Sequence, residues 1–92
     1  MSNKALDYNK LMFRLVKDFS WPSKYMFKFI VPFEAGLLNE VKSLFAEEAE
    51  ITHRESKNGN YISVTAVQLM DNPDEVIAIY RSAENIERII AL

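Results

Sequence analysis

The chain has 92 residues, of which 49% are hydrophobic, and this is enough for one compact domain with one core. It contains no cysteine, which excludes disulfides, thiolate metal sites and cysteine nucleophiles. The formal net charge of -2 argues against a protein held on nucleic acid by bulk electrostatics.

The first 32 residues are nevertheless basic, with six lysines and arginines against two aspartates, so the remainder carries a net charge of -6. We interpret these charges mainly as solvated faces, and the sharper alternative is a basic segment that meets an acidic partner. Polar residues at the start, and no run of about 20 apolar residues, predict a cytoplasmic protein without a signal peptide or membrane span.

A helix is predicted over residues 5–18, ahead of the main domain. Its apolar stripe has to rest on another surface, because a helix of about 14 residues is marginal in water by itself. The stripe consists of Leu11, Met12, Leu15, Val16 and Phe19.

The first strand is predicted from Lys24 to Val31, and it is closed by Pro32, which cannot donate to a sheet ladder. Strand alternation places one set of side chains on a common face: Tyr25, Phe27, Phe29 and Val31. The opposite, wetter face carries Met26, Lys28 and Ile30. An amphipathic helix over residues 34–48 follows.

A β-hairpin is the clearest element of the sequence. Two β-rich runs, Glu50 to Ser56 and Tyr61 to Leu69, flank the turn Lys57-Asn58-Gly59-Asn60. An Asn-Gly pair suits such a turn because both residues tolerate positive φ. In the second run, the side chains expected toward the core are Ile62, Val64 and Ala66. Those on its other face are Tyr61, Ser63 and Thr65.

The last two elements are a helix and a short strand. Asn72 is a good N-cap, Pro73 suits the first helical position and Glu75 stands three residues past the cap. The helix should end near Glu84, with an apolar stripe of Val76, Ile77, Tyr80 and Ala83. The final strand is predicted over Ile86 to Leu92, with its inward face unassigned.

Together these elements predict an α+β protein, a ferredoxin-like βαββαβ two-layer sandwich with an extra N-terminal helix. Right-handed crossovers give an antiparallel sheet in the order 4-1-3-2, with both helices on one face and the other face open. We expect one domain, 1–92, in which residues 1–20 form a helical extension and residues 21–92 form the ferredoxin-like unit.

Three stretches of the sequence, residues 21–32, 56–66 and 76–81, resemble the YbeD-like family of small bacterial proteins, a domain-of-unknown-function family. The likeness covers about residues 20–92, and Ser-Lys-Asn-Gly-Asn-Tyr is its most specific part. That family resembles ACT-type regulatory domains in fold, which implies ligand sensing or subunit association. The longer N-terminal segment departs from its shortest members, so no role for that segment is implied.

Residues suited to catalysis are few. His53 is the only histidine, and its parity with Ile51 in the predicted second strand favours a partly buried structural residue. The acidic residues Glu47, Glu48 and Glu50 are interpreted as a solvated helix end. We therefore expect no enzyme, no catalytic residue, no metal site and no cofactor.

Function is consequently predicted as binding. The favoured hypothesis is a regulatory or adaptor module that acts by protein–protein association or self-association. An ACT-like small-molecule sensor is the alternative, and an RNA-binding domain is disfavoured because the third strand supplies one aromatic residue where RNA-recognition sheets use at least two.

Two candidate surfaces follow from this prediction. The candidate interaction loop is Lys57, Asn58, Gly59, Asn60 and Tyr61. The candidate open sheet face is Met26, Lys28, Ile30, Ser63 and Thr65. Two questions stay open at this point: whether the loop is functional or only structural, and whether the N-terminal helix covers the open face.

Overall fold

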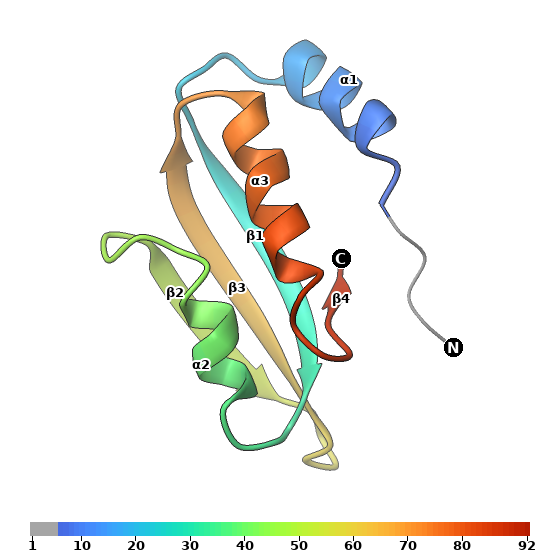
Figure 1. Cartoon of the computed structure of the whole chain (residues 1–92). Coiled ribbons are helices and arrows are strands. Elements are labelled where there is room, and N and C mark those ends of the chain that lie inside the picture. The colour runs from blue at the N-terminus through green and yellow to red at the C-terminus, as the bar shows by residue number, and fades with distance from the viewer. Residues whose placement is uncertain (1–5) are drawn as a thin grey trace.

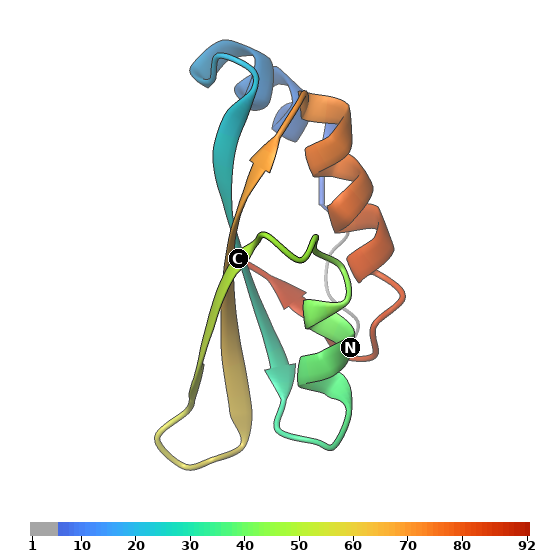
Figure 2. The same ribbon diagram turned by 90° about the vertical axis from the view of Figure 1, so that its left-hand side faces the viewer.

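The computed structural model describes residues 6–92. Its elements, in chain order, are α1 (Tyr8–Asp18), β1 (Ser23–Pro32), α2 (Leu37–Lys42), β2 (Glu50–Glu55), β3 (Tyr61–Met70), α3 (Pro73–Ala83) and β4 (Ile90–Ala91) (Figure 1). The strands form one antiparallel sheet in the order β2-β3-β1-β4. Helices α2 and α3 lie on the same side of it (Figure 2). The predicted ferredoxin-like architecture and strand order are therefore confirmed.

The centre of the sheet is a long pairing between β1 and β3. All ten residues of β1 have a partner, from Ser23 opposite Met70 to Pro32 opposite Tyr61. Directly opposite residues share a face of the sheet, so the inward alternation of the two strands coincides. The buried side chains of this pair include the predicted core residues Phe27, Phe29, Val31, Ile62, Val64 and Ala66.

Helix α3 begins and ends where its sequence signals place it. The Asn72 side chain accepts a hydrogen bond from the amide of Glu75 at 3.0 Å, and the Glu75 carboxylate accepts one from the amide of Asp71 at 3.0 Å. These two bonds satisfy backbone donors in and just before the first turn. The predicted apolar stripe of α3, which includes Tyr80, is buried.

Helix α2 is much shorter than the predicted range of residues 34–48. At its start, Gly36 has a φ of 91°, a left-handed conformation that a continuous α-helix cannot contain. At its end, the amide of Ala46 donates to the Gln68 side chain at 2.7 Å, and not to the carbonyl of Lys42 as a continued helix would require. The α-helical pattern has already ended before this point, since the amides of Leu44 and Phe45 donate to carbonyls three residues back, and Gln68 of β3 then bonds the segment that follows.

Strand β4 is also shorter than predicted. Only Ile90 and Ala91 pair with β1, although the amide of Leu92 also donates to the Lys28 carbonyl at 2.9 Å. Arg88 has a φ of 58°, which interrupts the extended backbone that the sequence suggested from Ile86 onward. Ile86 and Ile89 are both buried, so this segment does not follow the period of two that a strand has.

Helix α1 packs against α3 (Figure 1) and does not cover the open face of the sheet, which lies on the side away from α2 and α3 (Figure 2). Leu15 is its buried residue, and the Trp21 indole donates to the Leu15 carbonyl at 3.0 Å. The predicted stripe is wrong at Val16, which is 62% exposed because it lies about 100° around the helix from Leu15. The part of the helical extension before Leu6 lies outside the described residues.

No helix within residues 6–92 is long and apolar enough to cross a membrane.

Candidate functional site

The open face is formed by the outward side chains of β1, β3, β2 and β4. The register places Met26 opposite Val67, Lys28 opposite Thr65 and Ile30 opposite Ser63. The five residues predicted for this face, Met26, Lys28, Ile30, Ser63 and Thr65, therefore lie side by side at the centre of the sheet. Whether they form a binding site stays a prediction.

Apolar side chains remain exposed on this face. Met26 is 57% exposed and Leu69 is 60% exposed, and Ile90 lies opposite Ile30 at the β4 side of the sheet. The prediction omitted Leu69 and Ile90. Leu69 could have been predicted, because residues 63, 65 and 69 of β3 alternate onto the same face of the strand. Ile90 could not, because its place depends on the pairing of β4 with β1, which the sequence does not indicate.

The charges of the open face are mostly positive. Lys24 and Lys28 alternate with Met26 along β1, and the pairing of β2 with β3 puts Glu50 and Arg54 on the same side. Within residues 6–92, the ion pair is the one between Arg88 and Glu34. None of the four charged residues of the open face therefore has an oppositely charged partner in the described part of the chain. An acidic protein thus presents a locally basic, partly apolar surface.

The hairpin loop is held by its own polar groups. The Asn58 side chain accepts hydrogen bonds from the Ser56 hydroxyl at 3.0 Å and the Asn60 amide at 3.3 Å. Gly59 has a φ of 75°. Among the described residues, the others with a positive φ are Gly36 and Arg88, so Asn58 is not one of them. The expectation that Asn58 shares the left-handed conformation is wrong, because its side chain stabilises the turn from outside that region.

The remaining loop residues are arranged around that turn. The Asn60 carbonyl accepts a hydrogen bond from the Phe33 amide at 2.8 Å, which ties the loop to the segment after β1. The side chains of Lys57 and Asn60 are exposed, and Tyr61 begins β3 on the open face, opposite Pro32. The loop is thus a well-supported turn in which Lys57 and Asn60 are free to contact a partner.

His53 is exposed, contrary to the prediction of a partly buried residue. The reason is that β2 is an edge strand, and α2 packs against β1 and β3. Glu47, Glu48 and Glu50 are exposed as expected. Among the described residues, no group of three or more His, Asp or Glu side chains is placed to hold a metal ion.

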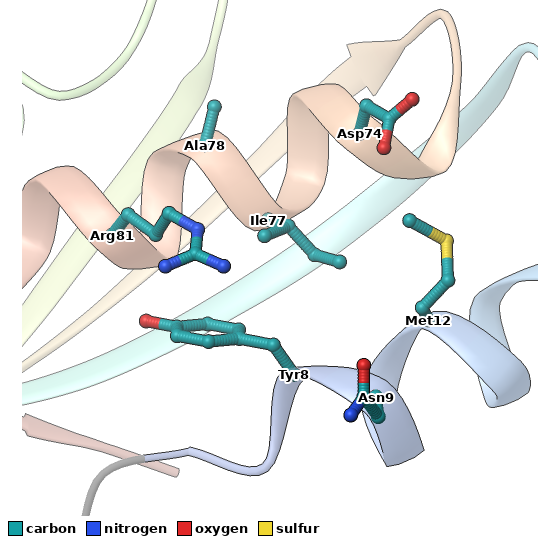
Figure 3. Close-up of a pocket in the computed structure, with 7 residues that line it drawn as sticks. All are labelled: Tyr8, Asn9, Met12, Asp74, Ile77, Ala78 and Arg81. Atoms are coloured by element: carbon teal, nitrogen blue, oxygen red, sulfur yellow. The ribbon is translucent and has the colours of Figure 1, made fainter.

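A groove of about 330 Å³ lies between α1 and α3 (Figure 3). Its lining consists of Tyr8, Asn9, Met12, Asp74, Ile77, Ala78 and Arg81. The carboxylate of Asp74 and the guanidinium of Arg81 mark its two ends along α3, with apolar side chains between them. The sequence does not reveal this groove, because it exists only where α1 docks on α3, a helix that is distant in the chain.

One end of the groove is closed by a polar cluster around Tyr8. Its ring stacks on the Arg81 guanidinium at 4.2 Å, and its hydroxyl donates a hydrogen bond to the Glu84 carboxylate. Partial burial, followed by the hydrogen bond to Glu84, raises the pKa of Tyr8 to about 12. The phenol therefore stays protonated, and able to donate, throughout the physiological pH range.

Comparison with solved structures supports the fold. The structure of an uncharacterized protein from Thermotoga maritima is similar, with a TM-score of 0.62 and 16% sequence identity, over 75% of this chain and 90% of that chain. At this identity the likeness is one of fold alone. A search of curated proteins finds no significant match.

A family model matches almost the same part of the chain as the resemblance predicted from the sequence. It is described as "Protein of unknown function (DUF493)", and it matches residues 17–92, from the end of α1 through β4. The resemblance inferred from the sequence is thereby confirmed. The chain belongs to this family of proteins of unknown function.

Proposed function

We propose that this protein acts by binding, as a regulatory or adaptor module of the cytoplasm, and that its open sheet face docks an acidic protein partner. The observation that carries the proposal is the exposure of Met26 and Leu69 beside Lys24 and Lys28, which form no ion pair within residues 6–92. Exposed apolar surface of this kind marks contact sites in soluble proteins. The basic side chains around it would select a partner of opposite charge and speed its association.

A second copy of the chain fits this face poorly. Packing one open face on another would bring the lysines of both copies, Lys24 and Lys28, into the same contact, with Glu50 as the acidic residue of the face. Like charges brought together at an interface are costly. The face therefore suits a different protein, with carboxylates around an apolar centre.

The positions of the aromatic residues also favour a protein partner over RNA. RNA-recognition sheets stack bases on exposed rings at the centre of the sheet. Here Phe27 and Phe29 of β1 point into the core, and the aromatic residue on the open face of the four described strands is Tyr61, at the start of β3. A face rich in Lys, Met, Ile and Thr offers apolar and charged contacts and few stacking platforms.

The groove between α1 and α3 supports a second candidate, a small-molecule sensor. Its volume of about 330 Å³ falls at the lower end of the range for ligand sites. Asp74 and Arg81 would suit a small zwitterion that lies along α3. A thermal-shift screen of zwitterionic metabolites tests this candidate: Arg81→Ala should abolish a shift that Lys42→Ala, on α2, retains.

The proposed docking face can be tested by site-specific photo-cross-linking in cytosol, with the photoreactive side chain at Met26. We expect one dominant adduct with an acidic protein, whose affinity for the purified chain should fall as the salt concentration rises. Lys28→Glu, Ile30→Asp and Thr65→Arg should each weaken that complex at least tenfold while circular dichroism shows an unchanged fold. Lys42→Glu, outside the face, is the matched control.

Two outcomes would contradict the proposal. Binding that survives both Ile30→Asp and Thr65→Arg would place the partner elsewhere on the molecule. A reproducible turnover that depends on His53 would overturn the view of the protein as a binding module.

A further inference from the structure

The outer edge of β2 is unpaired. β2 bonds to β3 on one side, and within residues 6–92 no strand lies on its other side. The amide of Ser56 donates to the Tyr61 carbonyl, so even-numbered residues of β2 direct their backbone groups toward β3. The backbone groups of Ile51, His53 and Glu55 consequently point outward, toward solvent.

Such an edge can accept another strand, and its side chains decide which one. Glu50, Thr52 and Arg54 lie on the open-face side of β2 and are all exposed. The three residues form a symmetric pattern with opposite charges on either side of a threonine. In an antiparallel strand that matches this edge, an arginine lies opposite Glu50, a threonine lies opposite Thr52 and a glutamate lies opposite Arg54.

A second copy of β2 supplies that order. If Thr52 of each copy lies on a two-fold axis, Glu50 of one copy is opposite Arg54 of the other, and this pair occurs twice. The same register places Ile51 opposite His53, both of which have outward backbone groups, so the ladder of hydrogen bonds can form. A shift of two residues that centres on His53 sets Arg54 opposite Thr52 and loses both charge pairs.

We propose that two copies of this chain associate through their β2 edges in this register and form a continuous antiparallel sheet. Within residues 6–92 no strand occupies the outer side of β2, so the backbone groups on that side can take part in this contact. The inference goes beyond the proposed docking of a partner, since it uses the edge of the sheet and not its face. The two open faces would lie side by side, with Lys24 and Lys28 of both copies still exposed.

The dimer is expected to be weak. Pairing two strands of six residues buries less surface than the 1,200 Å² or so that marks stable interfaces. Association should therefore depend on concentration in the micromolar to millimolar range, and sedimentation equilibrium is the appropriate measurement.

The absence of cysteine makes the register directly testable. In the proposed dimer, Thr52 is in a non-hydrogen-bonded pair with Thr52 of the other copy, where the Cα atoms lie about 4.5 Å apart, within the range of about 4.4–6.8 Å that a disulfide spans. Thr52→Cys should form a covalent dimer under mild oxidation at least tenfold faster than His53→Cys or Glu55→Cys. Faster cross-linking of His53→Cys, or equal rates for all three, would overturn the proposed register.

A charge swap tests the pairing without cysteine. Glu50→Arg or Arg54→Glu alone creates two like-charge pairs, and each should weaken the dimer about tenfold. The double variant E50R/R54E restores opposite charges and should return to within about threefold of the natural affinity. Failure of this rescue in a folded double variant, or a natural chain that stays monomeric at 1 mM, would contradict the proposal.

Discussion

The two faces of β1 differ in composition and in what surrounds them: the inner face carries Tyr25, Phe27, Phe29 and Val31, whereas the outer face alternates Met26 and Ile30 with lysines. On the inner face, Phe27 is fully buried, and its ring lies 5.2 Å from that of Phe45 and 5.4 Å from that of Tyr80. On the outer face, Met26 is 57% exposed between two lysines. Stability is thus concentrated on one face, so substitutions on the other can report on binding without unfolding the protein.

The strongest test of this difference compares two neighbouring residues. Phe27→Ala should lower the free energy of unfolding by about 3–5 kcal/mol, because it removes a buried aromatic ring and leaves a cavity. Met26→Ala should change the free energy of unfolding by about 0.5 kcal/mol or less, as exposed substitutions usually do. Urea denaturation followed by circular dichroism measures both. A large loss for Met26→Ala would mean that the outer face is covered in solution.

Helix α1 shows the same difference between faces and allows the next test. Leu15 is 1% exposed, so Leu15→Ala should cost about 2–3 kcal/mol, whereas Val16→Ala should cost about 0.5 kcal/mol or less. Trp21 is the only tryptophan, and its indole bonds to the Leu15 carbonyl, so its fluorescence reports on the docking of α1.

The contrary outcome is a fluorescence transition at lower urea than the circular dichroism transition. It would show that α1 detaches before the sheet unfolds, and that the helix is a separate unit.

Much of the fold could be predicted because local signals and the core pattern agree. The Asn72 cap, the turn at Gly59 and the alternation of β1 are each encoded within a few residues, and the structure reproduces all three. Such agreement between local preference and global packing is what makes a fold predictable.

The errors occurred where distant residues decide the local structure. Gln68 of β3 accepts the Ala46 amide just after α2, while Arg88 leaves the extended conformation beside its exposed ion pair with Glu34. The burial of His53 was also mispredicted, since periodicity does not reveal that its strand lies at the edge of the sheet. For the site, strand parity predicted which residues share the open face, but the groove near Tyr8 depends on the docking of α1 and has no sequence signature.

A smaller effect is expected at the hairpin, where the loop could be either a binding site or only a turn. Gly59→Val should cost about 1–2 kcal/mol, because a residue with a β-carbon is strained in the left-handed conformation. A β-carbon at this position would meet nothing within 4 Å, so crowding adds nothing to that cost.

The matched controls for the hairpin are Lys57→Ala and Asn60→Ala, which should leave stability within about 0.5 kcal/mol. Thermal melting compares all three variants. An unchanged melting temperature for Gly59→Val would remove the tight-turn interpretation, and loss of partner binding in either control would assign the loop a function of its own.

The smallest effect concerns the polar contact that fastens α1 to α3. Tyr8→Phe keeps the ring against Arg81 but removes the hydrogen bond to Glu84, so it should cost about 0.5–1.5 kcal/mol at pH 7. In the natural protein the pKa of Tyr8 is raised from 10.0 to about 12 in the folded state, so the stabilisation is complete below pH 10 and is lost as the pH rises toward 12. The difference in stability between the natural chain and Tyr8→Phe should therefore shrink between pH 10 and pH 12. A constant difference for Tyr8→Phe across this range would mean that the hydroxyl contributes little, and that α1 is held by Leu15 and its apolar neighbours alone.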